Sequence, residues 1–274
     1  MGEFINKIEA YNQDFMAKLP SVLEIERFVD DVIDFMFPMR LCYSKAKKSC
    51  LEDMDNLKAT FSELLSCILK EDEIKNTTTL FFGTLEGVFD KLTLDASAIL
   101  EFDPAANSLV EVVKAYPGFY AVAVYRIAFE MKQLNIPYLP RIIAEHAHSK
   151  TGIDINPSAQ IGQSFFIDHG TGVVIGETAI IGDFVKIYQG VTLGALQVAK
   201  HFANTKRHPT IENNVIIYSG ATILGGETVI GNNTVIGGNV WLTESVPSYS
   251  LVFAQHETKV RDKKEYVQAI DFVI

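Results

Sequence analysis

A six-residue repeat fills most of the second half of this 274-residue chain. After Gly152 an aliphatic residue recurs at every sixth position, interrupted at a few breaks, and Gly or a small polar residue follows closely. Most of these residues have a second small or β-branched residue two positions earlier, so each hexad sends two side chains inward and then turns. An ordinary β-sandwich would show period two and irregular turn spacing. Three short flat strands per coil, stacked coil on coil, would bury the pattern, which predicts a left-handed parallel β-helix. The thirteen positions are Ile155, Ile161, Ile167, Ile175, Ile181, Ile187, Leu193, Ile211, Ile217, Ile223, Ile230, Ile236 and Leu242.

The first half has a different period. Apolar residues step by three and four over 22–36 and 57–68, as amphipathic helices require, with breaks at Pro38 and at 76–79. A further helix is expected after Asp103-Pro104, where Asp103 would serve as the N-cap, and another up to Gly152. The expected fold class is α plus left-handed parallel β-helix: an all-α domain over 1–150, a hexapeptide-repeat β-prism with one inserted loop over 151–250, and a C-terminal tail over 251–274.

Composition excludes several classes of protein. The net charge of −10 lacks the basic excess that binding a phosphate backbone demands, so no nucleic-acid partner is expected. Cys42, Cys50 and Cys67 are odd in number and show no C-x-x-C spacing, so we expect reduced, buried thiols rather than disulfides or structural zinc. No apolar run reaches membrane-spanning length and no secretory signal begins the chain, which predicts a cytoplasmic protein without membrane contact.

Chemistry is expected where the repeat is interrupted. Two extra residues between Ile167 and Ile175 place His169 in a widened, glycine-flanked turn. A twelve-residue insertion between Leu193 and Ile211 ends in Arg207-His208-Pro209, so a second histidine stands beside a fixed cation. Asp154, on the first coil, could accept a hydrogen bond from His169 and favour the imidazolium that forms when the ring takes a proton.

Four runs of residues resemble the serine O-acetyltransferases of the hexapeptide-repeat acyltransferase superfamily. They are G-I-D-I-N-P over 152–157, I-D-H-G-T-G-V-V-I-G-E-T-A over 167–179, Q-G-V-T-L-G over 189–194 and K-R-H-P-T-I over 206–211. The resemblance covers 103 to about 245, and the D-H-x-T-G…G-E-T-A segment with a later R-H-P is specific within the superfamily. It implies transfer of acetyl from acetyl-CoA to the hydroxyl of L-serine, giving O-acetylserine for cysteine biosynthesis.

The resemblance also implies roles for individual residues. His169 would be the general base and Asp154 its orienting partner. Arg207 would bind the substrate carboxylate, which its planar two-donor fork fits, and His208 stands beside it. The other expected substrate-binding residues are Asp103 and Asp168, which would meet the substrate ammonium, and Glu177.

Coenzyme A is expected in the groove between neighbouring prisms, as in the family, with no metal. Positions that match the family's coenzyme contacts are Ala195, Ser219, Ala221 and Gly238. The resemblance further implies a homotrimer or a dimer of trimers built through the helical domain. Ile274 at the end of the tail would dock into O-acetylserine sulfhydrylase.

The residues themselves leave three alternative functions open. Departures from the family pattern at Asn156, Ala195 and the 196–205 loop leave room for a different hydroxyl or amine acceptor. A zinc hydratase on the same prism would need three imidazoles around one metal, whereas only His169 and His208 stand near the breaks. His146 and His148, two apart on an expected helix, face different sides and make no metal pair. A catalytically silent assembly module is the third alternative.

Overall fold

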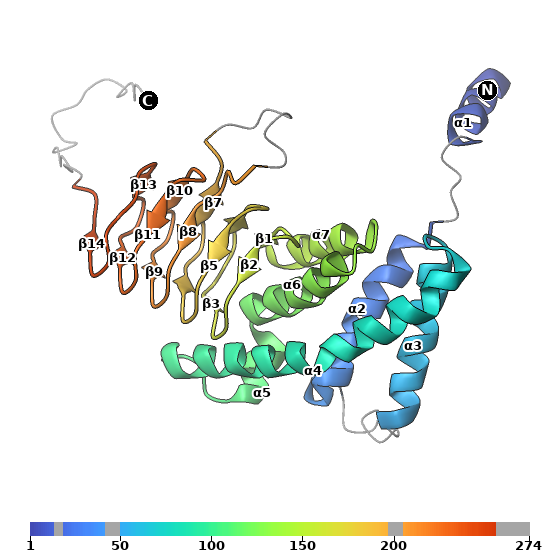
Figure 1. Cartoon of the computed structure of the whole chain (residues 1–274), viewed down its shortest axis with the longest axis horizontal. Coiled ribbons are helices and arrows are strands. Elements are labelled where there is room, and N and C mark those ends of the chain that lie inside the picture. The colour runs from blue at the N-terminus through green and yellow to red at the C-terminus, as the bar shows by residue number, and fades with distance from the viewer. Residues whose placement is uncertain (14–18, 42–49, 197–204, 256–274) are drawn as a thin grey trace, which may run out of the picture.

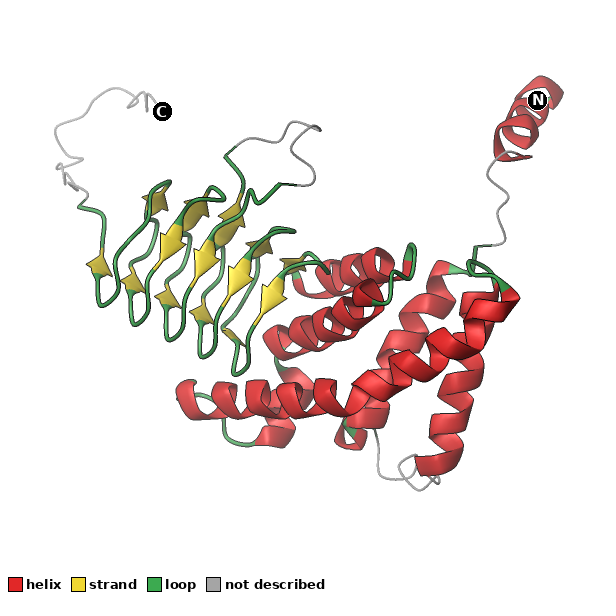
Figure 2. Cartoon of the chain, in the orientation of Figure 1, coloured by secondary structure: helices red, strands yellow, loops and turns green. Residues whose placement is uncertain are grey.

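The structure is a computed structural model that describes residues 1–13, 19–41, 50–196 and 205–255. A group of helices forms one end of the molecule and a stack of short strands forms the other (Figures 1 and 2). The chain passes once from helices to strands at Gly152. This residue ends the last helix in the left-handed conformation, with φ of 70°.

The helices span the stretches in which apolar residues step by three and four. They are α1 (Gly2–Gln13), α2 (Val22–Met36), the 3-10 helix η1 (Pro38–Arg40), α3 (Cys50–Ser66), α4 (Glu71–Phe102), α5 (Leu109–Ala115), α6 (Pro117–Gln133) and α7 (Leu139–Thr151). None of the described helices combines the length and apolar character needed to cross a membrane.

Three expectations for this half are wrong. The break expected at 76–79 lies inside α4, which continues through these polar residues: Asn76 and Thr79 are exposed, and the buried Thr78 hydroxyl shares a hydrogen bond of 3.1 Å with Ser62. Asp103 is the C-cap of α4 rather than an N-cap, and the next helix begins after Ser108, whose hydroxyl accepts from the Glu111 N–H. The thiols are not buried either: Cys50 is exposed and Cys67 is partly exposed, while Cys42 lies outside the described residues.

The strands form the three faces of a prism. Sheet A orders the strands β1-β4-β7-β10-β13, sheet B β11-β8-β5-β2 and sheet C β14-β12-β9-β6-β3, and every pairing is parallel. Each strand therefore pairs with the equivalent strand of the next coil (Figure 2). The bounds are β1 (Asp154–Ile155), β2 (Gln160–Ile161), β3 (Phe166–Ile167), β4 (Val174–Ile175), β5 (Ile180–Ile181), β6 (Lys186–Ile187), β7 (Thr192–Gly194), β8 (Thr210–Ile211), β9 (Ile216–Ile217), β10 (Thr222–Leu224), β11 (Val229–Ile230), β12 (Val235–Ile236), β13 (Trp241–Leu242) and β14 (Leu251–Val252).

The repeat positions and the strands coincide, which confirms the left-handed β-helix. Each of the thirteen aliphatic positions lies in its own strand, and all but Leu242 are buried. The structure adds one strand, β14, which pairs with β12 and carries the stack to Val252. The period of six therefore corresponds to one inward-facing aliphatic residue on each face of the prism.

Two of the prism's edges matter for the site. The C–A corner comprises the turns that lead from sheet C to sheet A, over 168–173, 188–191, 218–221 and 237–240. The A–B corner comprises the turns that lead from sheet A to sheet B, over 156–159, 176–179, 195–209 and 225–228, of which 197–204 lie outside the described residues. Sheet A separates the two corners.

A buried ion pair joins the helices to the first coil. Arg126 of α6 donates from Nε and Nη2 to the two carboxylate oxygens of Asp95 on α4, at 2.6 and 2.9 Å. Nη2 also donates to the Gly162 carbonyl at 2.7 Å, and the Phe165 N–H donates to Asp95 at 2.8 Å. Because both charges are buried, these bonds compensate the loss of water and fix α4 and α6 against the prism.

Candidate active site

The widened turn carries His169 at the C–A corner. Its backbone is left-handed, with φ of 56°, and its side chain is 71% exposed. The Gly172 N–H donates to the Gly152 carbonyl at 2.7 Å, and a Cβ at Gly170 would collide with the side chain of Ile153. These close approaches require glycine, so the turn is seated firmly while the imidazole projects from it. Its Nδ1 lies 3.6 Å from the Asp168 carboxylate.

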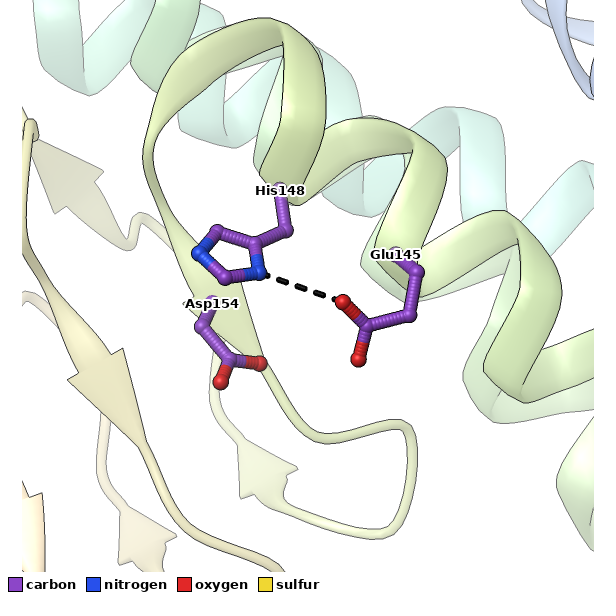
Figure 3. Close-up of side chains that lie close together, drawn as sticks. All are labelled: Glu145, His148 and Asp154. Carbon is purple, nitrogen blue, oxygen red and sulfur yellow. Dashed lines mark hydrogen bonds and ion pairs between the residues drawn. The ribbon is translucent and has the colours of Figure 1, made fainter.

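Asp154 lies on β1 and faces a histidine that the sequence did not single out as its neighbour. Its carboxylate, the His148 imidazole and the Glu145 carboxylate all lie within 4.8 Å of one another (Figure 3). Within the described chain, Asp154 makes no hydrogen bond or ion pair with His169. The available signal was the spacing of Glu145 and His148, which puts both on one side of α7.

This group has the residue types of a metal site, but its members are already engaged. His148 Nδ1 shares a hydrogen bond of 3.2 Å with Glu145, and Arg141 forms an ion pair with the other Glu145 oxygen. His146 faces Glu26 and Asp30 of α2, so the two histidines lie on different sides of α7. In the described parts of the chain, no three imidazoles converge as a zinc hydratase requires.

Acids and tyrosines gather beside His169. The Asp103 carboxylate accepts a hydrogen bond from the Tyr116 hydroxyl at 2.8 Å and another from the Ala105 N–H at 2.8 Å. Burial, the hydrogen bond to Asp103 and nearby carboxylates, including Asp168, raise the pKa of Tyr116 to about 12. Burial foremost, with Tyr218, Asp168 and Asp103, also raises the pKa of Tyr188. Asp103 and Asp168 therefore lie near the same two phenols.

Arg207 and His208 are held at the A–B corner by the 176–179 turn. The Thr178 hydroxyl accepts from the N–H groups of Arg207 and His208, at 2.9 and 3.1 Å. The Thr178 N–H in turn donates to His208 Nδ1 at 3.1 Å. Arg207 forms an ion pair with Glu177, and a Cβ at Gly176 would collide with the His208 ring. The G-E-T tripeptide thus contacts the R-H pair through all three of its residues.

His208 is kept neutral by its surroundings. Its side chain is buried, and burial, followed by the cations Arg207 and Lys206, lowers its pKa to about 4. Because Nδ1 accepts the Thr178 N–H, the ring proton of the neutral form resides on Nε2. His208 is therefore a fixed hydrogen-bond donor at neutral pH rather than a base.

Six of the seven predicted catalytic and substrate-binding residues form two groups in the chain, and Asp154 belongs to neither. His169, Asp168 and Asp103 gather at the C–A corner, whereas Arg207, His208 and Glu177 gather at the A–B corner. His169 makes its only ion pair in the described chain with Asp168, so it does not contact the Arg207 group. Within one chain, sheet A lies between the two groups.

The expected coenzyme positions also divide between the corners. Ser219 and Gly238 stack at the C–A corner, and Ala195 lies at the start of the inserted loop. In the described chain, the N–H groups of these three residues make no hydrogen bond. Ala221 differs, because its N–H donates to the Tyr218 carbonyl at 3.3 Å and its carbonyl accepts from Thr192. Ala221 therefore offers no unused N–H group to a ligand.

Comparisons with known proteins identify the family. No family model matches the chain. A serine acetyltransferase from Synechococcus elongatus is 51% identical over 180 residues, which cover 64% of this chain and 56% of that protein. A serine acetyltransferase from Staphylococcus xylosus is 48% identical over 158 residues, which cover 58% of this chain and 71% of that protein. The chain belongs to the serine acetyltransferase family.

The family resemblance extends to the helical half. The crystal structure of serine acetyltransferase isoform 3 from Entamoeba histolytica, solved in complex with cysteine, superposes with a TM-score of 0.78 at 31% identity. It covers 94% of this chain, and this chain covers 93% of it. The sequence matches are shorter than this structural match. This chain spans slightly more than half the length of each of three relatives from Synechococcus and Synechocystis.

Proposed function

We propose that this protein transfers an acetyl group from acetyl-CoA to the hydroxyl of L-serine, giving O-acetylserine and free coenzyme A. One observation carries the proposal. A projecting imidazole stands beside the Asp168 carboxylate at one corner of the prism, where Asp103 lies near the same phenols as Asp168. A fixed guanidinium with a neutral histidine stands at the next corner. A base, an ammonium site and a carboxylate site are the three elements that acylation of an amino-acid hydroxyl requires.

His169 would act as the general base. Its imidazole takes the proton of the serine hydroxyl while the hydroxyl oxygen attacks the thioester carbon. The tetrahedral intermediate then collapses, the carbon–sulfur bond breaks, and the coenzyme thiolate recovers the proton from the imidazolium. The Asp168 carboxylate at 3.6 Å stabilises that imidazolium. Asp154 would orient the ring once its carboxylate turns from His148 toward His169.

The acceptor would bind by both of its charged ends. The carboxylate meets Arg207, whose guanidinium Glu177 orients, and accepts the proton that His208 carries on Nε2. The ammonium meets Asp103 and Asp168. Since the two groups lie at different corners, we propose that neighbouring prisms in a homotrimer, or a dimer of trimers, supply one group each.

Coenzyme A would lie along the same seam. The N–H groups of Ala195, Ser219 and Gly238 would donate to its pantetheine arm or to the tetrahedral oxyanion. Ala221 would contribute only shape, because its backbone groups are already bonded. No metal takes part in this mechanism.

A different acceptor is the second candidate, because the chain departs from the family pattern at Asn156, Ala195 and the 196–205 loop, which would border the acceptor. The test is thiol release from acetyl-CoA with L-serine, with D-serine, with other amino acids and with a sugar acceptor. We expect L-serine to give the highest kcat/KM by at least about tenfold. A sugar lacks both charged ends, most other amino acids lack the hydroxyl, and D-serine held by both ends would direct its hydroxyl away from His169. A sugar, or an amine without a carboxylate, reacting as well as serine would overturn the proposal.

Two further expectations stay predictions. The docking of Ile274 into O-acetylserine sulfhydrylase concerns a residue outside the described part of the chain. Deleting Ile274 should abolish co-elution with that enzyme, and unchanged co-elution would refute the docking. The cytoplasmic location likewise stays a prediction.

A further inference from the structure

A tyrosine that no sequence motif pointed to controls the geometry of one acceptor-binding acid. Tyr116 stands between α5 and α6, as the C-cap of the first and the N-cap of the second. Its N–H donates to the Val112 carbonyl at 3.1 Å, and its carbonyl accepts from Tyr120 at 3.2 Å. Because both backbone groups are bonded, the position from which the phenol projects is fixed.

The start of α6 is seated directly on the strand that leads to His169. A Cβ at Gly118 would collide with the carbonyl of Ile167, the last residue of β3. Only glycine permits this approach. Asp168 and His169 follow Ile167 in the chain, and Tyr116 lies two residues before Gly118. The contact between Gly118 and Ile167 therefore fixes where Tyr116 lies relative to Asp168 and His169.

The hydroxyl of Tyr116 holds the Asp103 carboxylate from one side. It donates to Oδ2 at 2.8 Å, while the Ala105 N–H donates to Oδ1 at 2.8 Å. A carboxylate held at both oxygens cannot rotate about its terminal bond without losing one of these bonds. It still accepts further donors, since each oxygen has a second lone pair. Asp103 is thus fixed in direction and retains capacity for a ligand.

The surroundings favour a cation. Burial and Asp103 foremost, followed by the Glu111 and Asp168 carboxylates, raise the pKa of Tyr116. The rings of Tyr188 and Tyr218 stack at the same corner with their centroids 5.0 Å apart. Burial foremost, with Tyr218, Asp168 and Asp103, raises the pKa of Tyr188. Aromatic walls reduce the local dielectric, which strengthens attraction between an ammonium and two carboxylates.

We infer that Tyr116 is a positioning residue: its hydroxyl holds the Asp103 carboxylate beside Asp168, so that the two acids together recognise the ammonium of the acceptor. The inference rests on the proposed function and extends it to a residue outside the acyl-transfer chemistry. It assigns the acceptor's ammonium, rather than acetyl-CoA, as the group whose binding depends on Tyr116.

The test uses initial rates of the full chain and its Tyr116→Phe variant, which removes one oxygen atom. The KM for serine should rise about tenfold, because a hydrogen bond to a charged group is lost. The KM for acetyl-CoA and kcat should stay within about twofold, because Tyr116 touches neither the coenzyme nor the reacting atoms. Tyr249→Phe, at an exposed tyrosine, is the matched control and should change none of these values.

A double-mutant cycle separates positioning from a general structural effect. In an Asp103→Asn background, Tyr116→Phe should change the KM for serine by less than about twofold, since the partner through which it acts is already altered. An unchanged serine KM in Tyr116→Phe alone, an equal rise in both KM values, or independent effects in the cycle would overturn the inference. If the wild-type chain released no thiol with serine, the proposed function itself would fail, which is a distinguishable result.

Discussion

Thr178 and His208, thirty positions apart in the sequence, hold each other at the A–B corner. The Thr178 N–H donates to His208 Nδ1 at 3.1 Å, and the Thr178 hydroxyl accepts the His208 N–H at 3.1 Å. The same hydroxyl lies 2.9 Å from Nδ1. This mutual bonding explains why a threonine in the second coil and a histidine at the end of the inserted loop belong to one site.

Replacing His169 with alanine should lower kcat at least about a hundredfold, because a general base contributes roughly that factor or more. Steady-state thiol release with saturating serine and acetyl-CoA measures it. His148→Ala is the matched control, since His148 also lies near Asp154 but is not the proposed base. It should retain kcat within about threefold. The reverse pattern would make His148 the functional imidazole.

Replacing Gly176 with alanine should displace His208, because a Cβ at Gly176 would collide with the ring. We expect a loss of about 1–3 kcal/mol in the free energy of unfolding from overpacking, together with a clear rise in the KM for serine. The control is Gly87→Ala on α4, where a Cβ would meet nothing within 4 Å. That change should stabilise the fold by about 0.5–1 kcal/mol. Equal effects of both substitutions would contradict this account.

The stability that His208 contributes should depend on pH. Its pKa in the folded chain is about 4, below the ordinary value of 6.5. Between these pH values His208 is protonated in the unfolded chain and neutral in the folded chain. The free energy of unfolding therefore falls as pH drops from about 6.5 toward 4. Above pH 6.5 this contribution is complete.

The measurement compares the Tm of the wild type with that of His208→Gln, which cannot titrate, from pH 7 to pH 4.5. The advantage of the wild type should shrink as pH falls. A constant gap between wild type and His208→Gln would show that His208 titrates alike in the folded and unfolded chains.

Replacing Asp95 with asparagine should lower the free energy of unfolding by about 3–5 kcal/mol, because it leaves the buried Arg126 guanidinium without a counter-charge. Denaturant unfolding measures the loss. Glu145→Gln removes one partner of the exposed Arg141–Glu145 pair and should cost no more than about 1 kcal/mol. Similar losses in both variants would mean that burial of the Asp95 pair contributes little.

Cysteine should compete with serine for the acceptor site. It has the same carboxylate and ammonium groups as serine and differs only in sulfur for oxygen, so Arg207, Asp103 and Asp168 would recognise it equally. Initial rates at several serine concentrations should show that cysteine raises the KM for serine with kcat unchanged. Inhibition that serine cannot relieve would place cysteine elsewhere.

The local sequence determined the β-helix and its strand positions. Each of the thirteen aliphatic positions occupies one strand. A coil with three faces buries one aliphatic residue per face, so the six-residue period is already visible within a single coil. The two-residue widening likewise marked the turn of His169. Turn geometry and inward burial depend on neighbours a few residues away, so a single sequence is enough to reveal them.

Contacts between distant segments were decided by the tertiary structure alone. Asp103 became a C-cap held by Tyr116, Asp154 came to lie beside His148, and Asp95 met Arg126 between α4 and the first coil. No local pattern encodes these pairings, since they arise from how α4, α6 and α7 pack on the prism. The separation of the His169 group from the Arg207 group has a different cause, because the two breaks in the repeat fall at different corners of the three-sided prism.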